Sequence, residues 1–247
     1  MKDKLIIVGG SFGRTYQYKR NLSDTSKRWA NILANKLNLI EKNYCRAGCS
    51  IEYSSHELFK YIKSVGYNKK DIIIFLLPGD VGSPVIEPSF HPEWASNMIR
   101  YLSGEKIKNK EILNHYKRFK SFYTYLVTWA FEKEVIESKI FYILSTLKSL
   151  PNLTLLIPSD NIEIVNKVKF YVEKDSNNIC IKETLLDISK NEYQDGDFGI
   201  NRIERKDYRA NHLSEPNHII LANELHKVII NKSSKEFQIN NFEKNIL

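Results

Sequence analysis

The sequence predicts an α/β fold: a three-layer sandwich in which a central parallel sheet carries helices on both faces. Two observations predict it. Short strand-like runs alternate with helical patterns along the chain, and the first run, rich in β-branched residues, breaks into glycines as a buried strand does before a tight turn. The length of 247 residues, 42% of them hydrophobic, is enough for one well-cored domain of this class.

The expected elements follow in order. Strand-like composition occurs at 5–8, 39–44, 71–77, 153–157 and 178–181, of which the second and last are the weaker segments. Helical periodicity falls between and after these runs, at 26–37, 52–65, 108–150 and about 214–230. The pattern of strand, helix and strand favours parallel pairing across the sheet.

One domain is expected over 1–230, followed by a polar and loosely packed C-terminal tail at 231–247. The stretch 78–97 is the longest without periodicity and contains four prolines and two glycines. Loops of this length inside a domain tend to be functional or disordered. With Phe90, His91 and Trp94 it is a candidate substrate wall, and a surface loop with a hydrophobic anchor is the equal alternative.

Charge and hydropathy exclude several classes of protein. The net charge is +8, but the lysines are scattered, so no specific nucleic-acid partner is expected. No run approaches the ~18 apolar residues of a membrane span. The N-terminus leads into only four strongly apolar residues, too few for a secretory signal, so a cytoplasmic or already processed chain is expected.

The cysteine count does not indicate a disulfide framework. The chain has three cysteines, Cys45, Cys49 and Cys180, and the spacing of the first two lacks the second pair of ligands that a zinc site needs. We expect reduced, mostly buried thiols, with no metal and no cofactor.

The first candidate for chemistry is a serine on a turn. Gly9-Gly10-Ser11 directly follows the first predicted strand. Glycines allow a sharp turn, and the carboxyl end of a parallel strand is where open α/β sheets place their ligands. The alternative is that Ser11 only caps the next helix.

The second candidate lies 200 residues later. In the stretch 211–218, NHLSEPNH, Ser214 is a predicted N-cap and Pro216 suits the first helical turn. His212 therefore lies in the loop just before a helix, where a histidine can serve as general base at neutral pH. His218 falls inside the helix and is expected to pack or cap.

Four stretches in this order resemble the blocks of the SGNH (GDSL-like) hydrolase superfamily. VGGSFG at 8–13 is similar to the nucleophile block, and WANILANKL at 29–37 resembles the helix that follows it. NYCRAGCS at 43–50 looks like the second block, and HLS at 212–214 with His218 resembles the final histidine block. The resemblance implies a flavodoxin-like fold, Ser11 as nucleophile, His212 as base, and the backbone N–H groups of Ser11 and Gly48 as oxyanion donors.

The chain departs from the family pattern at three places. Gly10 stands where an acidic residue is usual, and the third block reads LPGD at 77–80, so Gly79 and Asp80 occupy the place of an asparagine donor. An ionised Asp80 would repel an oxyanion. Arg209 stands where the orienting aspartate is expected, which leaves Asp207, five residues before His212, as the candidate acid.

The leading hypothesis is an ester hydrolase that removes a short acyl group, acetyl foremost, from a small molecule or a glycan. Acyl transfer to a sugar is a close variant. One alternative is a catalytically degenerate domain used for binding or assembly, which the departures favour. A lesser alternative is a nucleotidyltransferase-like enzyme, although residues 14–55 contain no histidine for its usual second element.

Overall fold

The computed structural model describes seven stretches of the chain and a few isolated positions between them. The stretches are 2–13, 27–46, 51–65, 68–77, 133–159, 177–192 and 213–244, and the isolated positions are 104, 110, 113, 114, 117 and 166.

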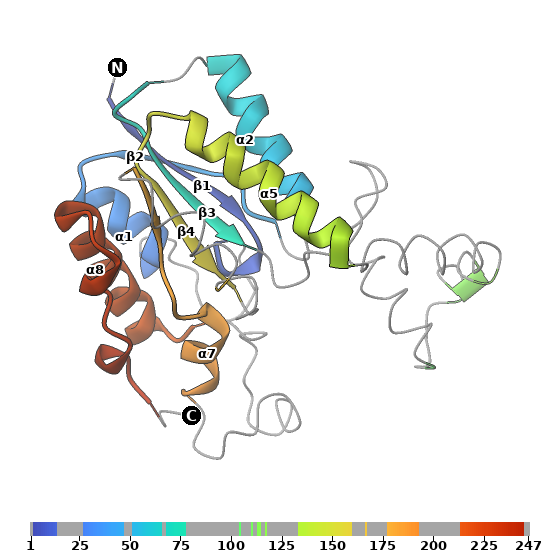
Figure 1. Ribbon diagram of the computed structural model, residues 1–247. Coiled ribbons are helices and arrows are strands. Elements are labelled where there is room, and N and C mark those ends of the chain that lie inside the picture. Colours follow the sequence, from blue (N-terminus) through green and yellow to red (C-terminus); the bar gives the residue numbers. More distant parts are fainter. Residues whose placement is uncertain are drawn as a thin grey trace.

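The centre of the molecule is a five-stranded sheet in which every pairing is parallel, in the order β2-β1-β3-β4-β5 (Figure 1). The strands are β1 (Lys4–Gly9), β2 (Ile40–Asn43), β3 (Ile72–Leu77), β4 (Thr154–Pro158) and β5 (Asn178–Cys180). Leu5 pairs with Ile72, and Ile73 with Thr154. This strand order is that of flavodoxin-like doubly wound sheets, so the predicted fold class is confirmed.

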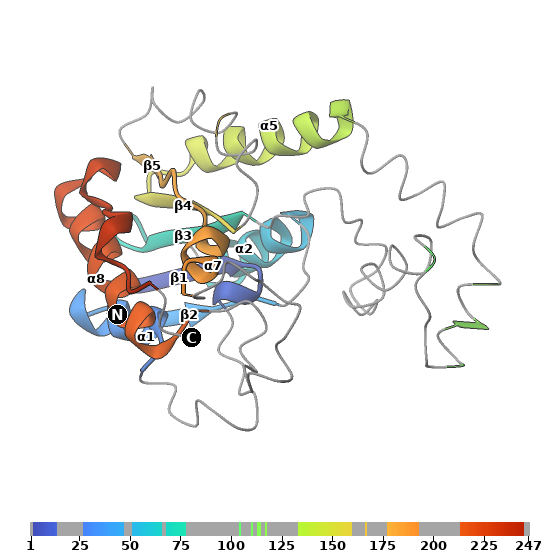
Figure 2. The ribbon, with the colours of Figure 1, turned by 90° about the horizontal axis from the view of Figure 1, so that it is seen from below.

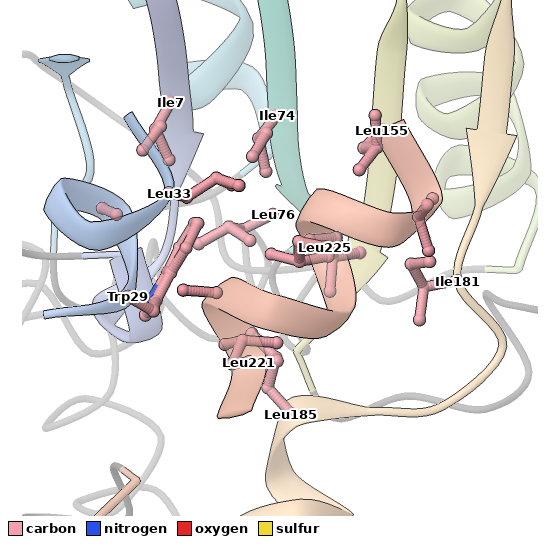
Figure 3. Close-up of a cluster of buried hydrophobic side chains, with 14 of the residues drawn as sticks. Ile7, Trp29, Leu33, Ile74, Leu76, Leu155, Ile181, Leu185, Leu221 and Leu225 are labelled. Carbon is pink, nitrogen blue, oxygen red and sulfur yellow. The ribbon is translucent and has the colours of Figure 1, made fainter. Parts of the chain in front are cut away.

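One face of the sheet is covered by three helices: α1 (Trp29–Lys36), α7 (Leu185–Lys190) and α8 (Glu215–Asn231). Their buried side chains form one apolar cluster with alternate residues of the central strands, Ile7 of β1 and Ile74 of β3 among them. Figure 3 shows Trp29 of α1 and Leu225 of α8 within this cluster. Burial of these apolar side chains is the main contribution to the stability of the domain.

The opposite face is covered by α2 (Ile51–Val65) and α5 (Lys133–Ser149). The strand residues between those of the first cluster point here, including Ile6 and Phe75, and they pack against Leu58 and Leu144. Figure 2 shows α2 and α5 on the side away from α1 and α8. Because both faces are covered, β1, β3 and β4 are apolar almost throughout.

The chain after α8 is packed rather than loose. It forms two short 3-10 helices, η3 (Ser234–Glu236) and η4 (Ile239–Asn241), and buries Phe237 and Phe242 in the first cluster, with ring centroids 5.7 Å apart. The expectation of a loosely packed tail is therefore wrong for 232–244, because two aromatic residues among polar ones are enough to anchor the segment.

The predicted strands and helices otherwise match closely. The helix at 26–37 begins three residues later than expected, and α5 lies within the helical stretch expected at 108–150. Helix α7 was not predicted. The candidate wall at 78–97 lies outside the described residues. In the described part of the chain, no helix is long and apolar enough to cross a membrane.

Candidate active site

The candidate site begins where β1 ends. Gly9 is the last residue of β1, with φ +136°, and the 3-10 helix η1 (Ser11–Gly13) starts two residues later. Strand β2 lies on one side of β1, and β3, β4 and β5 lie on the other. Ser11 is therefore at the topological switch point, outside the carboxyl ends of the strands, where doubly wound sheets bind ligands.

Close packing explains two of the glycines in this turn. A Cβ on Gly9 would lie against the backbone oxygen of Leu76 and 2.5 Å from its Cβ, and the positive φ also disfavours a side chain. A Cβ on Gly13 would meet the Cys45 Sγ and lie 2.6 Å from Leu76 Cδ1. Around Gly10, by contrast, the nearest atom to such a Cβ is the Ser159 Oγ at 3.9 Å.

The loop after β2 is tied to the serine turn. The Asn43 Nδ2 donates to the Gly13 carbonyl oxygen at 2.6 Å, and its Oδ1 accepts from the Cys45 N–H at 3.0 Å. The Arg46 N–H donates to the Gly9 carbonyl oxygen at 2.9 Å. The chain leading toward Gly48 thus leaves the sheet beside Ser11.

Trp29 joins the serine turn to the start of α8. Its indole Nε1 donates to the Phe12 carbonyl oxygen at 2.9 Å, and its backbone N–H donates to His218 Nδ1 at 3.5 Å. His218 lies in the first turn of α8 and is 8% exposed, so its predicted packing role is confirmed. The beginning of α8 is therefore held on the same side of the sheet as Ser11.

The start of α8 is built as the sequence predicts. Ser214 is the N-cap, with its side-chain oxygen accepting from the Asn217 N–H at 3.5 Å, and Pro216 stands in the first turn. Leu213, the residue directly after His212, is buried in the core beneath α8.

Of the predicted site residues, the structure describes the backbone of Ser11. His212, Asp207, Gly48, Gly79 and Asp80 lie outside the described residues. The nearest described residues along the chain are Leu213 beside His212, Arg46 two residues before Gly48, and Leu77, the last residue of β3, two residues before Gly79.

Two residues of this region were missed by the sequence reasoning. Glu192, just after α7, is fully buried, and its Oε1 accepts hydrogen bonds from Ser214 and Asn217. Ser159, just after β4, is 7% exposed, and its hydroxyl has no hydrogen-bond partner in the part of the chain that the structure describes. No local sequence pattern indicates either residue, because the residues that lie close to them in space are far away along the chain.

Two arginines stand on the segments that contact the serine turn. Arg28, which precedes Trp29, is buried, and burial lowers the pKa of its guanidinium while the Glu41 carboxylate raises it. An arginine nevertheless stays protonated at neutral pH. The Arg46 guanidinium lies over the Tyr53 ring, 5.6 Å from its centroid. Among the described residues, no group of His, Cys, Asp or Glu is arranged to hold a metal ion.

Comparison with known proteins supports the fold. No family model and no curated protein matches the chain. Among solved structures, the chain is similar to the psychrotrophic esterase EstA from Pseudoalteromonas sp., in a structure inhibited by monoethylphosphonate. The two share 9% sequence identity with a TM-score of 0.50, and the match covers 93% of this chain and 98% of EstA. A carbohydrate esterase described as having divergent catalytic and non-catalytic binding functions matches at a TM-score of 0.47 and 15% identity, over 96% of this chain and 70% of that one.

Proposed function

We propose that this chain is a serine ester hydrolase that removes a short acyl group, acetyl foremost, from a small molecule or a glycan. The observation that carries the proposal is the position of Ser11, the first residue after the β1 turn, at the switch point of a 2-1-3-4-5 sheet. The esterase EstA shares this fold. A shared fold alone does not determine chemistry, so the proposal depends on the site.

In the proposed reaction, the Ser11 Oγ attacks the carbonyl carbon of the ester while His212 takes the hydroxyl proton. The tetrahedral intermediate collapses, and the alcohol leaves with the proton from His212. A water molecule, deprotonated by His212, then attacks the acyl-serine, releases the carboxylic acid and restores Ser11. No cofactor takes part in these steps.

The oxyanion of the intermediate needs donors that are already oriented. The first N–H groups of a helical turn have no acceptor within it, and they point out of its start. The N–H of Ser11, at the start of η1, and the N–H of Gly48 are the proposed donors. Each such donor contributes about 2.7–4 kcal/mol to the transition state. The hydrogen bonds from Asn43 and Arg46 that hold the β2 loop against the turn support this assignment.

The test is hydrolysis of p-nitrophenyl acetate, butyrate and octanoate by the wild type, Ser11→Ala and Ser64→Ala. Ser64 is an exposed serine of α2 that is hydrogen-bonded within its own helix, so it controls for loss of a hydroxyl elsewhere. We expect turnover at background in Ser11→Ala, unchanged turnover in Ser64→Ala, and a preference for acetate.

Labelling by a fluorophosphonate probe checks the nucleophile directly. We expect a covalent adduct on the Ser11-containing peptide of the wild type, and none on that peptide in Ser11→Ala. A wild type with neither turnover nor adduct would reject the hydrolase and favour the alternative of a degenerate domain used for binding, to which the departures at Asp80 and Arg209 point.

A further inference from the structure

Glu192, which contacts the start of α8, is fully buried, with an exposed fraction of 0%. Its Oε1 accepts three hydrogen bonds: from the Ser214 N–H at 2.8 Å, from the Ser214 hydroxyl at 2.6 Å and from the Asn217 Nδ2 at 2.6 Å. A buried carboxylate is tolerated only where such donors surround it. Here all three donors belong to the N-cap and first turn of α8.

This contact fixes the chain immediately after His212. Ser214 is two residues beyond His212, so their Cα atoms are at most about 7 Å apart. Leu213 between them is buried in the core. The carboxyl group of Glu192 thus binds the chain two residues beyond His212.

A histidine that acts as base needs an acceptor for its second ring nitrogen. A carboxylate there holds the imidazole in the right tautomer and orientation and stabilises the imidazolium that forms. Asp207, five residues before His212, was the candidate from the sequence, and it lies outside the described residues.

We propose that Glu192, rather than Asp207, is the acid that orients His212, with its Oε2 accepting the Nδ1–H of the imidazole. The role presupposes His212 as the base of the function proposed above. Glu192 is a positioning residue, because it acts on the ester only through the histidine. Its Oε1 anchors the loop by way of Ser214, and its Oε2 aligns the ring.

The kinetic test uses Glu192→Gln, an isostere that keeps the Oε1 acceptor for Ser214 and Asn217 but lacks the second acceptor. We expect kcat to fall on the order of 10²–10⁴-fold with little change in KM. The acidic limb of the kcat/KM profile moves to lower pH, because the loss of a negative charge disfavours the imidazolium. Glu192→Asp retains a carboxylate and restores part of kcat.

Two controls separate this role from a structural one. Asp207→Asn is expected to keep kcat within about threefold. Glu224→Gln removes another buried carboxylate, which belongs to α8 itself and binds the segment after the helix, and is expected to change stability but not the pH profile. A large loss in Asp207→Asn, or a Glu192→Gln enzyme with an unchanged pH profile, would overturn the assignment.

A measurement independent of catalysis keeps the two proposals apart. In ¹⁵N-labelled protein, the His212 ring is expected to carry its proton on Nδ1 with a strongly downfield N–H resonance, identified by its absence in His212→Ala. The resonance is lost in Glu192→Gln and kept in Asp207→Asn. If it behaves so in a protein without esterase activity, the proposed function fails, and the hydrogen bond between Glu192 and His212 stands without a catalytic role. If it is absent from the wild type or disappears in Asp207→Asn, the role of Glu192 is refuted whatever the activity.

Discussion

Two buried glutamates form hydrogen bonds at different parts of α8, Glu192 at its start and Glu224 in its second half, and these hydrogen bonds secure different segments of the chain. Glu192 contacts Ser214 and Asn217 at the start of the helix, all with exposed fractions of 8% or less. Glu224, within the second half of α8, is 2% exposed and accepts hydrogen bonds from the Gln238 N–H at 2.9 Å, from Asn241 Nδ2 at 2.9 Å and from Lys227 Nζ at 2.7 Å.

The same chemistry thus has two consequences. Within α8, the hydrogen bonds of Glu224 hold the C-terminal segment against the helix, and so contribute to stability. At the start of α8, those of Glu192 fix the residues that follow His212, which border the candidate site. The C-terminal segment also reaches the start of α8, because the Glu243 N–H donates to Asn217 Oδ1 at 2.8 Å.

The largest expected effect on stability concerns the segment that Glu224 holds. Phe237→Ala removes a ring that is 4% exposed in the first core cluster, and we expect a loss of about 3–5 kcal/mol in the free energy of unfolding. Ile230→Ala, at a 61% exposed position in the last turn of α8, is the control and is expected to stay within about 0.5 kcal/mol. Equal urea midpoints for the two variants would mean that the segment does not contribute to the core.

Truncation of the two glutamate side chains compares their contributions directly. Glu192→Ala leaves buried donors on Ser214 and Asn217 unsatisfied, at about 1–3 kcal/mol each, and we expect a total loss near 3 kcal/mol. Glu224→Ala frees donors whose residues are exposed and can turn to water, so the expected loss is about 1 kcal/mol. Urea unfolding measures both losses of free energy. A larger loss in Glu224→Ala than in Glu192→Ala would show that exposure of the freed donors does not set the cost.

The pH dependence of stability tests the hydrogen bonds that Glu224 accepts. Burial raises the pKa of Glu224, but hydrogen bonds from Lys227, Asn241 and the Gln238 backbone together lower it below its ordinary value of 4.5. A carboxyl group whose pKa is lower in the folded state contributes stability above its unfolded pKa, and this contribution is lost as the pH falls through the folded value. We expect the free energy of unfolding to decline less steeply below about pH 4.5 in Glu224→Gln than in the wild type. Identical slopes would exclude this contribution.

The smallest effect is expected at an exposed glutamate of the same helix. Glu215 forms an ion pair with Lys27 at 2.8 Å, and their side chains are 43% and 50% exposed. Glu215→Gln is expected to cost about 0.5 kcal/mol in low salt and less in 0.5 M NaCl, because exposed pairs are screened. A loss as large as that of Glu192→Ala would show that burial is not what distinguishes the two glutamates.

The site could be predicted only where its chemistry is local. The glycine turn with Ser11, the N-cap Ser214 and the packing role of His218 all follow from residues within a few positions of each other. Glu192 is 22 residues from Ser214 along the chain, and Ser159 is about 150 residues from the Gly10 that it faces. Neither stands in a pattern that a sequence displays.

By itself, the sequence determined which segments become strands and helices. The strands are buried on both faces and therefore apolar, and the longer helices bury one periodic face. Helix α7 has six residues and is too short to show a helical period, and Phe237 and Phe242 stand among polar residues in the sequence. The contribution of both segments to the hydrophobic core is therefore evident only in the folded structure.

The tertiary structure alone decided the order 2-1-3-4-5, which places Ser11 at a switch point, and the contacts that bring α8 beside it. Strand order depends on how the connecting helices cross the sheet, and a buried carboxylate depends on donors supplied from elsewhere in the chain. The physical reason is the same in both cases: these features are set by long-range burial and hydrogen bonding, which local propensity does not encode.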